Sequence, residues 1–333
     1  MALTDKSRPK TFMDVVGQPF TVSVLSNQVA NKTFKHCYLF CGAYGTGKTS
    51  MARILASSVN DGEGTPIEMD AASNSGVDSI RSIVQDAQQM PLDCRYKVYI
   101  IDEAQNLSKA AWDAALKLIE EPPEHCIFIF CTTEPQKIPS TIMSRVQRFD
   151  FHPVKMSVIA DRLDFLCNEV LHCDFERSAT ERIASWANGH VRDAVNALER
   201  VYDAEGSIHM NGVEKALGVP SSALVEGFLC GLVDRDAEEC LKNLKELATC
   251  GVKMSSVYDD IISTALDACV YCVSGTLTVG RVSDKLAQAA KKDVLLLKKF
   301  SSRAVWLREV VTDDSAYAIL TALCFEVCGE GRE

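Results

Sequence analysis

Gly42-Ala-Tyr-Gly-Thr-Gly-Lys48-Thr49 is the most informative stretch of this 333-residue sequence. It matches the pattern G-x-x-x-x-G-K-[ST] in full, and it lies between a short apolar run and a segment with helical spacing. Glycines at these positions let backbone N–H groups turn inward around phosphate oxygens. Lys48 is then expected to reach the β- and γ-phosphates and Thr49 to bind Mg²⁺, at the positive end of the following helix. We therefore predict a phosphate-binding loop rather than a glycine-rich turn with an exposed lysine.

Short apolar runs and helical patterns alternate on both sides of this loop. The runs at residues 37–41, 97–101 and 126–131 are rich in β-branched and aromatic side chains and lack polar alternation, as strands buried on both faces do. Helical patterns cover residues 50–58, 77–89 and 109–120, and the pair Pro122-Pro123 ends the third. This order predicts an α/β domain in which helices cover both faces of a parallel sheet.

From about residue 154 the pattern is helical, with apolar residues recurring at three- and four-residue spacing. The expected helices are 157–170, 178–187, 191–202, 223–233, 237–250, 254–273, 285–298 and 315–328, with a turn at 203–207. We predict three domains: an ATP-binding base domain at 1–153, a small helical lid at 154–216 and an all-helical domain at 217–333.

Composition limits the classes of function. The formal net charge is −10, so the chain as a whole is not expected to attract nucleic acid electrostatically. This total does not exclude a basic face on one side of the molecule, because it does not report how the charges are distributed. No apolar run reaches the ~18–20 residues that span a bilayer, and the N-terminus lacks the apolar segment of a signal peptide. These features predict a cytosolic protein without membrane contact, in which the 14 cysteines are thiols.

Two carboxylates follow the predicted strand at 97–101. A strand beside the phosphate loop would bring Asp102 near Mg²⁺ and let Glu103 orient and deprotonate the attacking water. A polar turn at a strand end is the simpler interpretation of Asp-Glu alone. Because the pair follows a phosphate loop by some fifty residues, we favour an ATP hydrolase.

Three further polar residues are candidates on pattern. Thr133 ends the strand at 126–131, where a hydroxyl can lie beside the γ-phosphate, although strand capping explains it equally well. Arg145 could stabilise charge on a transferred phosphoryl group as an arginine finger does, but a surface arginine is the better interpretation of its pattern alone. Arg192, at the start of a predicted helix, poses the same question.

Several motifs together resemble a known family. Arg8-Pro-Lys-Thr-Phe-Met-Asp-Val-Val-Gly-Gln18 is similar to the opening of clamp-loader ATPases. Further matching segments, in the same order, are residues 42–49, 68–78, 101–104, 116–124, 132–139, 144–145 and 189–194. The series resembles the gamma/tau clamp-loader subunits of bacterial DNA polymerase III, in the AAA+ superfamily. The resemblance is specific from residue 8 to about residue 200, and beyond that it rests on helical pattern, length and position.

The resemblance implies roles for residues around a bound nucleotide. It implies ATP and Mg²⁺ as cofactors, with Thr133 as sensor 1 and Arg192 as sensor 2. It implies that Arg145 acts in trans, on ATP held by a neighbouring subunit. The residues expected to bind nucleotide are Arg8, Val16, Gly17, Gly42, Gly45, Gly47, Lys48, Thr49, Ser50, Asp102 and Arg192.

The resemblance also implies partners. These are delta- and delta-prime-like subunits, further copies of this chain joined through the C-terminal collar, a sliding clamp and primer–template DNA. Arg81 is a candidate phosphate contact to DNA and Lys109 a weaker one; such contacts fix position without reading bases.

The chain departs from the family pattern at several places. Residues 56–66 bridge the position of the family's four-cysteine zinc module and contain no cysteine, so no zinc is expected there. A deletion, a divergent bacterial lineage or a phage origin would each explain this. Tyr44 stands where Arg is common and Ser7 where Tyr is common; both flank the nucleotide and could change affinity. Val146 follows Arg145 in place of Cys, and the sequence ends as a short, gamma-like form would.

Two cysteine pairs have spacings that could bind zinc. These pairs, Cys269 with Cys272 and Cys324 with Cys328, lie in predicted apolar helices, and we interpret them as core thiols. Cys37 and Cys41 flank a buried strand and are interpreted in the same way.

The sequence thus predicts an ATP-driven clamp-loader subunit, in the bacterial cytoplasm or in a host cytoplasm if the chain is phage-encoded. A homo-oligomeric AAA+ ATPase that remodels DNA is an alternative. A nucleotide-binding scaffold with little hydrolysis is another, although the intact set Lys48, Asp102, Glu103 and Thr133 argues against it.

Overall fold

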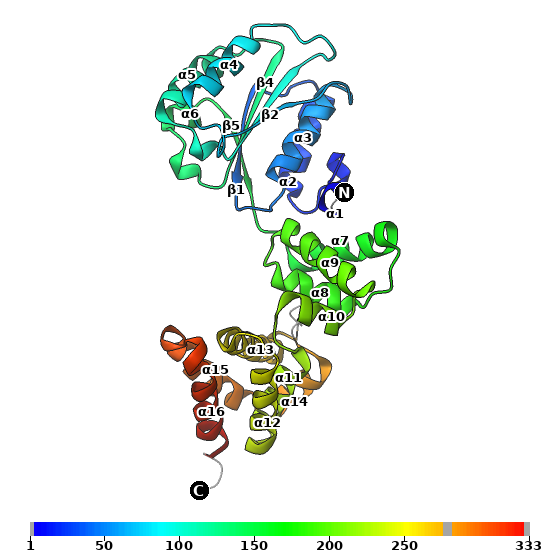
Figure 1. The fold of residues 1–333 in the computed structure, drawn as a ribbon, viewed down its shortest axis with the longest axis vertical. Coiled ribbons are helices and arrows are strands. Elements are labelled where there is room, and N and C mark those ends of the chain that lie inside the picture. The colour runs from blue at the N-terminus through cyan, green and yellow to red at the C-terminus, as the bar shows by residue number, and fades with distance from the viewer. Residues whose placement is uncertain (1–2, 276–281, 330–333) are drawn as a thin grey trace. The chain divides into compact units, whose positions relative to one another are not determined.

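A computed structural model describes residues 3–275 and 282–329 (Figure 1). The chain divides into two compact units, one formed by Met1–Arg162 with Ala187–Asn196 and the other by Leu163–Trp186 with Ala197–Glu333. The helices α7 (Met156–Leu166) and α9 (Val191–Glu205) contribute to both.

A five-stranded parallel sheet forms the centre of the first unit. Its strand order is β2-β3-β4-β1-β5. In register, Cys41 of β1 pairs with Thr132 of β4, and Ile101 of β3 pairs with Phe130. The carboxyl ends of these three strands therefore lie at one edge of the sheet. The strands are β1 (Cys37–Gly42), β2 (Ile67–Asp70), β3 (Lys97–Asp102), β4 (Cys126–Thr132) and β5 (Gln147–Phe151).

Helices cover both faces of this sheet, as the sequence predicts (Figure 1). On one face, Leu39 of β1 packs with α4, α5 and α6; on the other, Phe40 packs with α2 and α3. Alternate residues of one strand thus enter two different cores, which is why the central strands are apolar throughout. The helices of this unit are α1 (Leu3–Lys6), α2 (Pro19–Ala30), α3 (Lys48–Val59), α4 (Val77–Asp86), α5 (Lys109–Glu120) and α6 (Ser140–Met143), with 3-10 turns at Phe12–Asp14, Ala104–Asn106 and Pro135–Lys137.

The sequence prediction missed both edge strands. β2 has no buried residue, and only Phe149 and Phe151 of β5 are buried. An edge strand has one neighbour and need not carry a continuous apolar run. In β5 the alternation of buried and exposed side chains was a usable signal, whereas β2 offered none.

The second unit is helical in the described residues apart from one isolated bridge, between Phe175 and Ile208. It contains the end of α7 and most of α9. Its other helices are α8 (Arg177–Trp186), α10 (Met210–Leu217), α11 (Ser222–Val233), α12 (Ala237–Thr249), α13 (Met254–Ser274), α14 (Asp284–Lys292), α15 (Val294–Leu307) and α16 (Asp313–Gly329), plus a π-helical turn at Cys167–Leu171 and a 3-10 turn at Arg308–Val310.

From α9 onward, the structure departs from the predicted helices and turns in three respects. The expected helix at 285–298 is two helices, because the Asp293 carboxylate accepts a hydrogen bond from the Leu296 N–H and caps α15. The expected turn at 203–207 begins too early, since α9 continues to Glu205. Helix α10 was not predicted.

One large apolar core joins α11 to α16 in the second unit. Besides it, an ion pair links α8 to α13: Arg182 Nη2 lies 2.7 Å from Asp260 Oδ2, and the two side chains are 6% and 15% exposed. This pair connects residues of the second and third predicted domains within one compact unit. The three-domain division and its boundaries stay a prediction.

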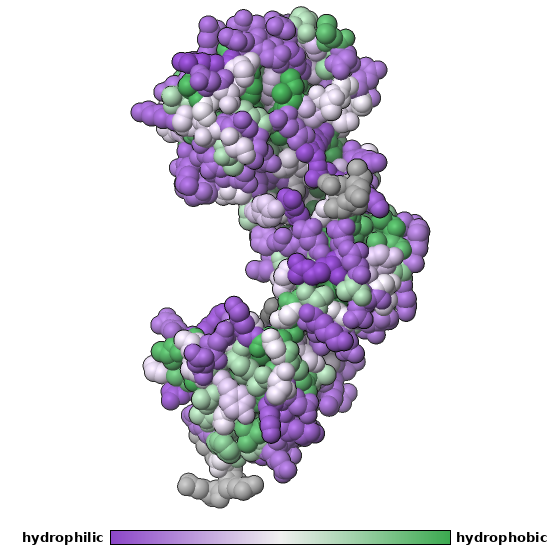
Figure 2. All heavy atoms as spheres, viewed as in Figure 1, coloured by the Kyte–Doolittle hydropathy of each residue, from purple (hydrophilic) through white to green (hydrophobic). Residues whose placement is uncertain are grey.

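Large hydrophobic side chains reach the surface near the end of the chain. On the face drawn in Figure 2, green hydrophobic areas interrupt the hydrophilic surface of the C-terminal helices. Exposed members of α15, α16 and the turn between them are Leu295, Val305, Trp306, Val310, Tyr317 and Phe325. All fourteen cysteines lie within the described residues and are free thiols.

Within the described residues, no single helix combines the length and apolar composition needed to cross a bilayer; only α10 and α11 taken together, with a 98° bend between them, meet both criteria.

Replacing Gly42 with alanine should destabilise the first unit. Gly42 has φ +153°, and a Cβ there would lie 2.3 Å from the carbonyl oxygen of Phe151. Gly62→Ala is the matched control, because Gly62 has φ +90° but no atom within 4 Å of the added carbon. We expect Gly42→Ala to lower the free energy of unfolding by about 1–3 kcal/mol more than Gly62→Ala. Urea unfolding of both variants measures this, and equal losses would contradict the close packing of β1 against β5.

Candidate nucleotide-binding site

The phosphate loop joins β1 to α3, at the edge of the sheet where the strands end. Gly45 and Gly47 have φ of +72° and +100°, which a side chain would resist. Gly47 is also the residue that caps the N-terminus of α3. Successive backbone N–H groups in such a turn, together with the N-terminus of a helix, form a concave site for anions. The loop thus has the backbone geometry that its sequence predicts.

Lys48 is buried and turned back onto the loop. Its Nζ donates to the carbonyl oxygens of Gly42 and Ala43, over 2.9 and 3.0 Å. Burial lowers the pKa of Lys48, whereas the nearby carboxylates of Glu103 and Asp102 act in the opposite direction. The ammonium group therefore sits in the loop beside two acids, with carbonyl partners that phosphate oxygens can replace.

Asp102 links the loop to the end of β3. Its Oδ2 accepts a hydrogen bond from the Thr49 hydroxyl over 2.8 Å, and its Oδ1 accepts one from the Glu103 N–H over 3.0 Å. A hydroxyl and a carboxylate at this distance are hard oxygen donors of the kind that Mg²⁺ prefers, alongside waters and substrate phosphates. The pair therefore fits the magnesium role that the sequence predicts for both residues.

Glu103 adopts an unusual backbone conformation. Its φ of 50° and ψ of 43° lie in the left-handed region, which is uncommon for a residue with a side chain. Such backbone strain gathers at functional sites, where the surrounding structure holds it. The conformation places Glu103 among the residues that line the same pocket as Lys48 and Asp102.

Gln105 joins Glu103 to the end of β4. Its amide Nε2 donates to Glu103 Oε2 and, over 2.9 Å, to the Thr133 hydroxyl. Its Oε1 accepts from the buried Thr132 hydroxyl over 2.8 Å, and the Thr133 hydroxyl lies 3.3 Å from Glu103 Oε2. Sequence reasoning missed Gln105, since nothing in a single glutamine after Ile101-Asp-Glu-Ala marks it. The side-chain amide of Gln105, whose nitrogen and oxygen both have hydrogen-bond partners, thus links Thr133 to Glu103.

An apolar wall faces these polar groups across one pocket. The wall contains Pro9, Val15, Val16, Val191 and Val195. A pocket lined by both apolar side chains and the phosphate loop has the two kinds of surface that a nucleotide requires. The predicted residues that line it are Arg8, Val16, Gly45, Gly47, Lys48, Thr49, Ser50, Asp102, Glu103 and Arg192.

Other predicted residues lie beside the pocket rather than in its lining. Gly42 contributes the carbonyl that Lys48 binds, and Gly17 follows the lining residue Val16. The Thr133 hydroxyl is hydrogen-bonded to Gln105 and Glu103. Lining residues that the sequence analysis did not single out as site residues are Thr4, Pro9, Val15, Thr46, Arg162, Val191 and Val195. Helical spacing on either side of Arg192 could have indicated the last two.

Tyr44, in the phosphate loop, and Arg192, near the start of α9, contact each other. The Arg192 guanidinium carbon lies 5.3 Å from the centre of the Tyr44 ring, within the range of a cation–π contact. His190 Nδ1 is 2.7 Å from the Tyr44 carbonyl oxygen. Ser7 also lines the pocket, so both departures from the family pattern that flank the predicted nucleotide lie where they can affect it.

Arg145 is held away from this pocket. Its Nη2 lies 2.9 Å from Glu120 Oε1, its Nη1 donates to the Thr141 carbonyl over 2.7 Å, and its side chain is 39% exposed. The two candidate DNA contacts are also exposed and outside the pocket: Arg81 on α4, paired with Asp78 over 3.1 Å, and Lys109 at the start of α5.

Several known proteins are similar to this chain in sequence. A family model described as "DNA polymerase III, delta subunit" matches residues 64–155. DNA polymerase III subunit tau of Bacillus subtilis is 40% identical over 79% of this chain and 51% of its own length. The Escherichia coli subunit tau is 33% identical over 78% of this chain and 44% of its own length. The chain thus spans about half the length of these tau relatives.

A shorter relative and a solved structure complete the comparison. DNA polymerase III subunit gamma of Buchnera aphidicola is 31% identical over 78% of this chain and 76% of its own length. The RuvB Holliday junction branch migration motor of Thermotoga maritima superimposes with a TM-score of 0.54 at 21% identity, over 78% of this chain and 91% of that one, which is a likeness of fold.

The phosphate loop, the acidic pair at the end of β3 and the match to a gamma subunit along most of its length lead to one conclusion: the chain belongs to the gamma/tau family of DNA polymerase III subunits.

Proposed function

We propose that this chain is an ATPase subunit of a DNA replication clamp loader, which uses ATP binding and hydrolysis to open a sliding clamp and place it on primer–template DNA. The observation that carries the proposal is the meeting of Lys48, Thr49, Asp102 and Glu103 at one edge of the sheet, beside an apolar wall. Membership of the gamma/tau family supplies the context in which such a site drives clamp loading.

Lys48, Thr49 and Asp102 are proposed to hold the triphosphate. Lys48 would exchange its carbonyl partners for β- and γ-phosphate oxygens, at little cost because it is already buried and positioned. Thr49 and Asp102 would hold Mg²⁺, which when bound neutralises charge on the β- and γ-phosphates. Gly45, Gly47 and Ser50 would add backbone and hydroxyl donors around the phosphates.

Glu103 is proposed to be the general base. It would orient the attacking water and take its proton, which requires a carboxylate held at a defined position. Gln105 and Thr133 meet that requirement by hydrogen-bonding the same carboxylate oxygen. Thr133 thereby serves as sensor 1, because any γ-phosphate contact that moves its hydroxyl also moves Glu103.

Arg8, Val16 and Gly17 are proposed to line the adenosine side, and Arg192 to be sensor 2. Arg192 is part of the pocket and lies over the Tyr44 ring, and no carboxylate among the described side chains forms an ion pair with it. It can leave Tyr44 for a phosphate without breaking a salt bridge. Tyr44 would then be free to contact the ligand or solvent.

Arg145 is proposed to act in trans, on ATP held by a neighbouring subunit. It lies outside the pocket of its own chain, is half-exposed, and is fixed by Glu120 and the Thr141 carbonyl. A pre-positioned arginine on the surface suits a contact that forms only on assembly. The exposed hydrophobic side chains of α15 and α16 support a C-terminal collar through which subunits join.

The remaining assignments concern partners and location. Delta- and delta-prime-like subunits, copies of this chain and a sliding clamp are the proposed protein partners. Arg81 and Lys109 are the proposed contacts to DNA phosphates, on two helices that pack together. The bacterial cytoplasm is the proposed location.

Replacing Glu103 with glutamine should separate binding from turnover. The amide keeps the side chain's size but cannot accept the water's proton, so we expect an unchanged ATP dissociation constant and a hydrolysis rate lower by about 10²–10⁴-fold. Steady-state phosphate release and nucleotide titration measure the two quantities. Glu121→Gln, at an exposed position, is the control. Normal turnover in Glu103→Gln would refute the assignment of the base.

Replacing Arg145 with alanine should lower the ATPase rate only in the assembled complex. The chain is reconstituted with its partner subunits, and its ATPase rate is measured with and without primer–template DNA and sliding clamp. We expect DNA and clamp together to raise the wild-type rate, and Arg145→Ala to lower the stimulated rate on the order of 10³-fold without changing nucleotide binding.

The control for this experiment is Arg148→Ala. Arg148 lies on β5, its side chain is exposed to a similar extent as that of Arg145, and it has its own carboxylate partner, Asp150. A rate that is indifferent to the clamp but raised by DNA would contradict clamp loading and favour a DNA-remodelling ATPase. A rate unchanged by Arg145→Ala would contradict the role in trans.

A further inference from the structure

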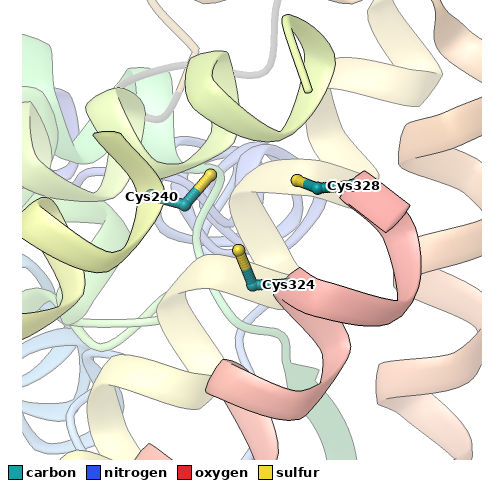
Figure 3. A group of neighbouring side chains, drawn as sticks. All are labelled: Cys240, Cys324 and Cys328. Atoms are coloured by element: carbon teal, nitrogen blue, oxygen red, sulfur yellow. The ribbon is translucent and has the colours of Figure 1, made fainter. Parts of the chain in front are cut away.

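Three cysteine side chains from two helices point toward one another in the second unit (Figure 3). Cys240 is the fourth residue of α12, and Cys324 and Cys328 lie one turn apart on α16. Their three Sγ atoms all lie within 4.8 Å of one another. Residues four apart share one face of a helix, so both sulfurs of α16 are presented to α12.

The cluster is dry. Cys240 and Cys324 are 0% exposed and Cys328 is 8% exposed, within the core formed by α11 to α16. Cys240 Sγ lies 3.4 Å from the Phe228 carbonyl oxygen, and a Cβ at Gly231 would lie only 2.8 Å from the same sulfur. Helix α11 therefore fixes the position of this thiol from behind.

The sulfur separations fit thiolate coordination. With metal–sulfur bonds of about 2.3 Å, three thiolates around one ion lie roughly 3.8–4.0 Å apart, for tetrahedral or trigonal angles respectively. From separations of at most 4.8 Å, each pair needs to close by no more than about 1 Å. Side-chain rotation on two helices that already pack together can supply such a movement.

The charge balance favours a divalent ion over a monovalent one. Binding of a divalent cation to three thiols releases three protons and leaves a site of net charge −1. The N-terminal turn of α12 and the guanidinium of Arg235, whose charge acts on Cys328, both oppose that remaining charge.

The cluster differs from the chain's other cysteines. Cys269 and Cys272 have a similar sequence spacing, but among the described residues only Cys240, Cys324 and Cys328 form a group of three candidate ligands. From the sequence alone, no zinc is expected at residues 56–66, and Cys324 and Cys328 are interpreted as core thiols. That interpretation does not consider Cys240, which the fold brings within 4.8 Å of both.

We propose that Cys240, Cys324 and Cys328 form a binding site for a thiophilic divalent cation, which ties α16 to α12 in the C-terminal helical domain. The ion reaches the site through the last turn of α16, where Cys328 has its small exposed fraction. Because the three cysteines belong to the second unit and the phosphate loop to the first, the expected effect of the ion is on the stability of the helical domain rather than on ATP turnover.

Cadmium titration of the full, reduced, metal-free chain tests this site. Cd²⁺ is the probe because its thiolate complexes absorb in the near ultraviolet. We expect one tight equivalent per chain, with release of three protons and an increase in the thermal unfolding temperature. Cys240→Ser with Cys324→Ser should abolish the absorption and the stabilisation, whereas Cys269→Ser with Cys272→Ser should retain both.

Two results would overturn the proposal. One is the absence of a tight Cd²⁺ equivalent in the wild-type chain, a measurement that needs no variant to fold. The other is retention of the absorption in the Cys240 and Cys324 variant, which would place the ion on other thiols. Single Cys328→Ala, at the least buried of the three positions, provides a milder variant and should weaken Cd²⁺ binding at least tenfold.

Discussion

Parallel pairing of β1, β3 and β4 is the constraint on which the site depends. Because Cys41 pairs with Thr132 and Ile101 with Phe130, three loops leave the sheet at the same edge. The order β3-β4-β1 then sets the end of β4 between the phosphate loop and the acidic pair. An antiparallel strand at any of these places would send its polar end to the opposite edge and leave the pocket incomplete.

Hydrogen bonds within the pocket keep its charged groups ready without a ligand. Lys48 is held by carbonyl oxygens, Asp102 by a hydroxyl and an N–H group, and Glu103 by Gln105. A buried charge with partners costs much less than one without. Each of these partners is neutral, so a nucleotide can replace or share it without breaking a buried salt bridge. Arg192 likewise has a neutral partner, the aromatic ring of Tyr44.

The sequence indicated the central strands and the phosphate loop because both have strong local signals: continuous apolar runs and a fixed glycine spacing. It did not indicate β2, which has no buried residue, or the break at Asp293, where an acceptor side chain caps a new helix. Gln105 was missed for a different reason. Its hydrogen bond to Thr133 forms because β3 and β4 are neighbours in the sheet. The two residues are 28 apart in the sequence, and neither segment has a local pattern that indicates the contact.

The central claim is that the pocket of the first unit is one complete nucleotide site. Calorimetric titration of the full chain with ATP and Mg²⁺ tests it most directly, with Lys48→Met as the comparison. The account predicts one saturable ATP site per chain, weakened in Lys48→Met by at least about 1.5–3 kcal/mol, the value of a charged hydrogen bond. Absence of saturable binding in the wild-type chain, or equal affinity in the variant, would contradict it.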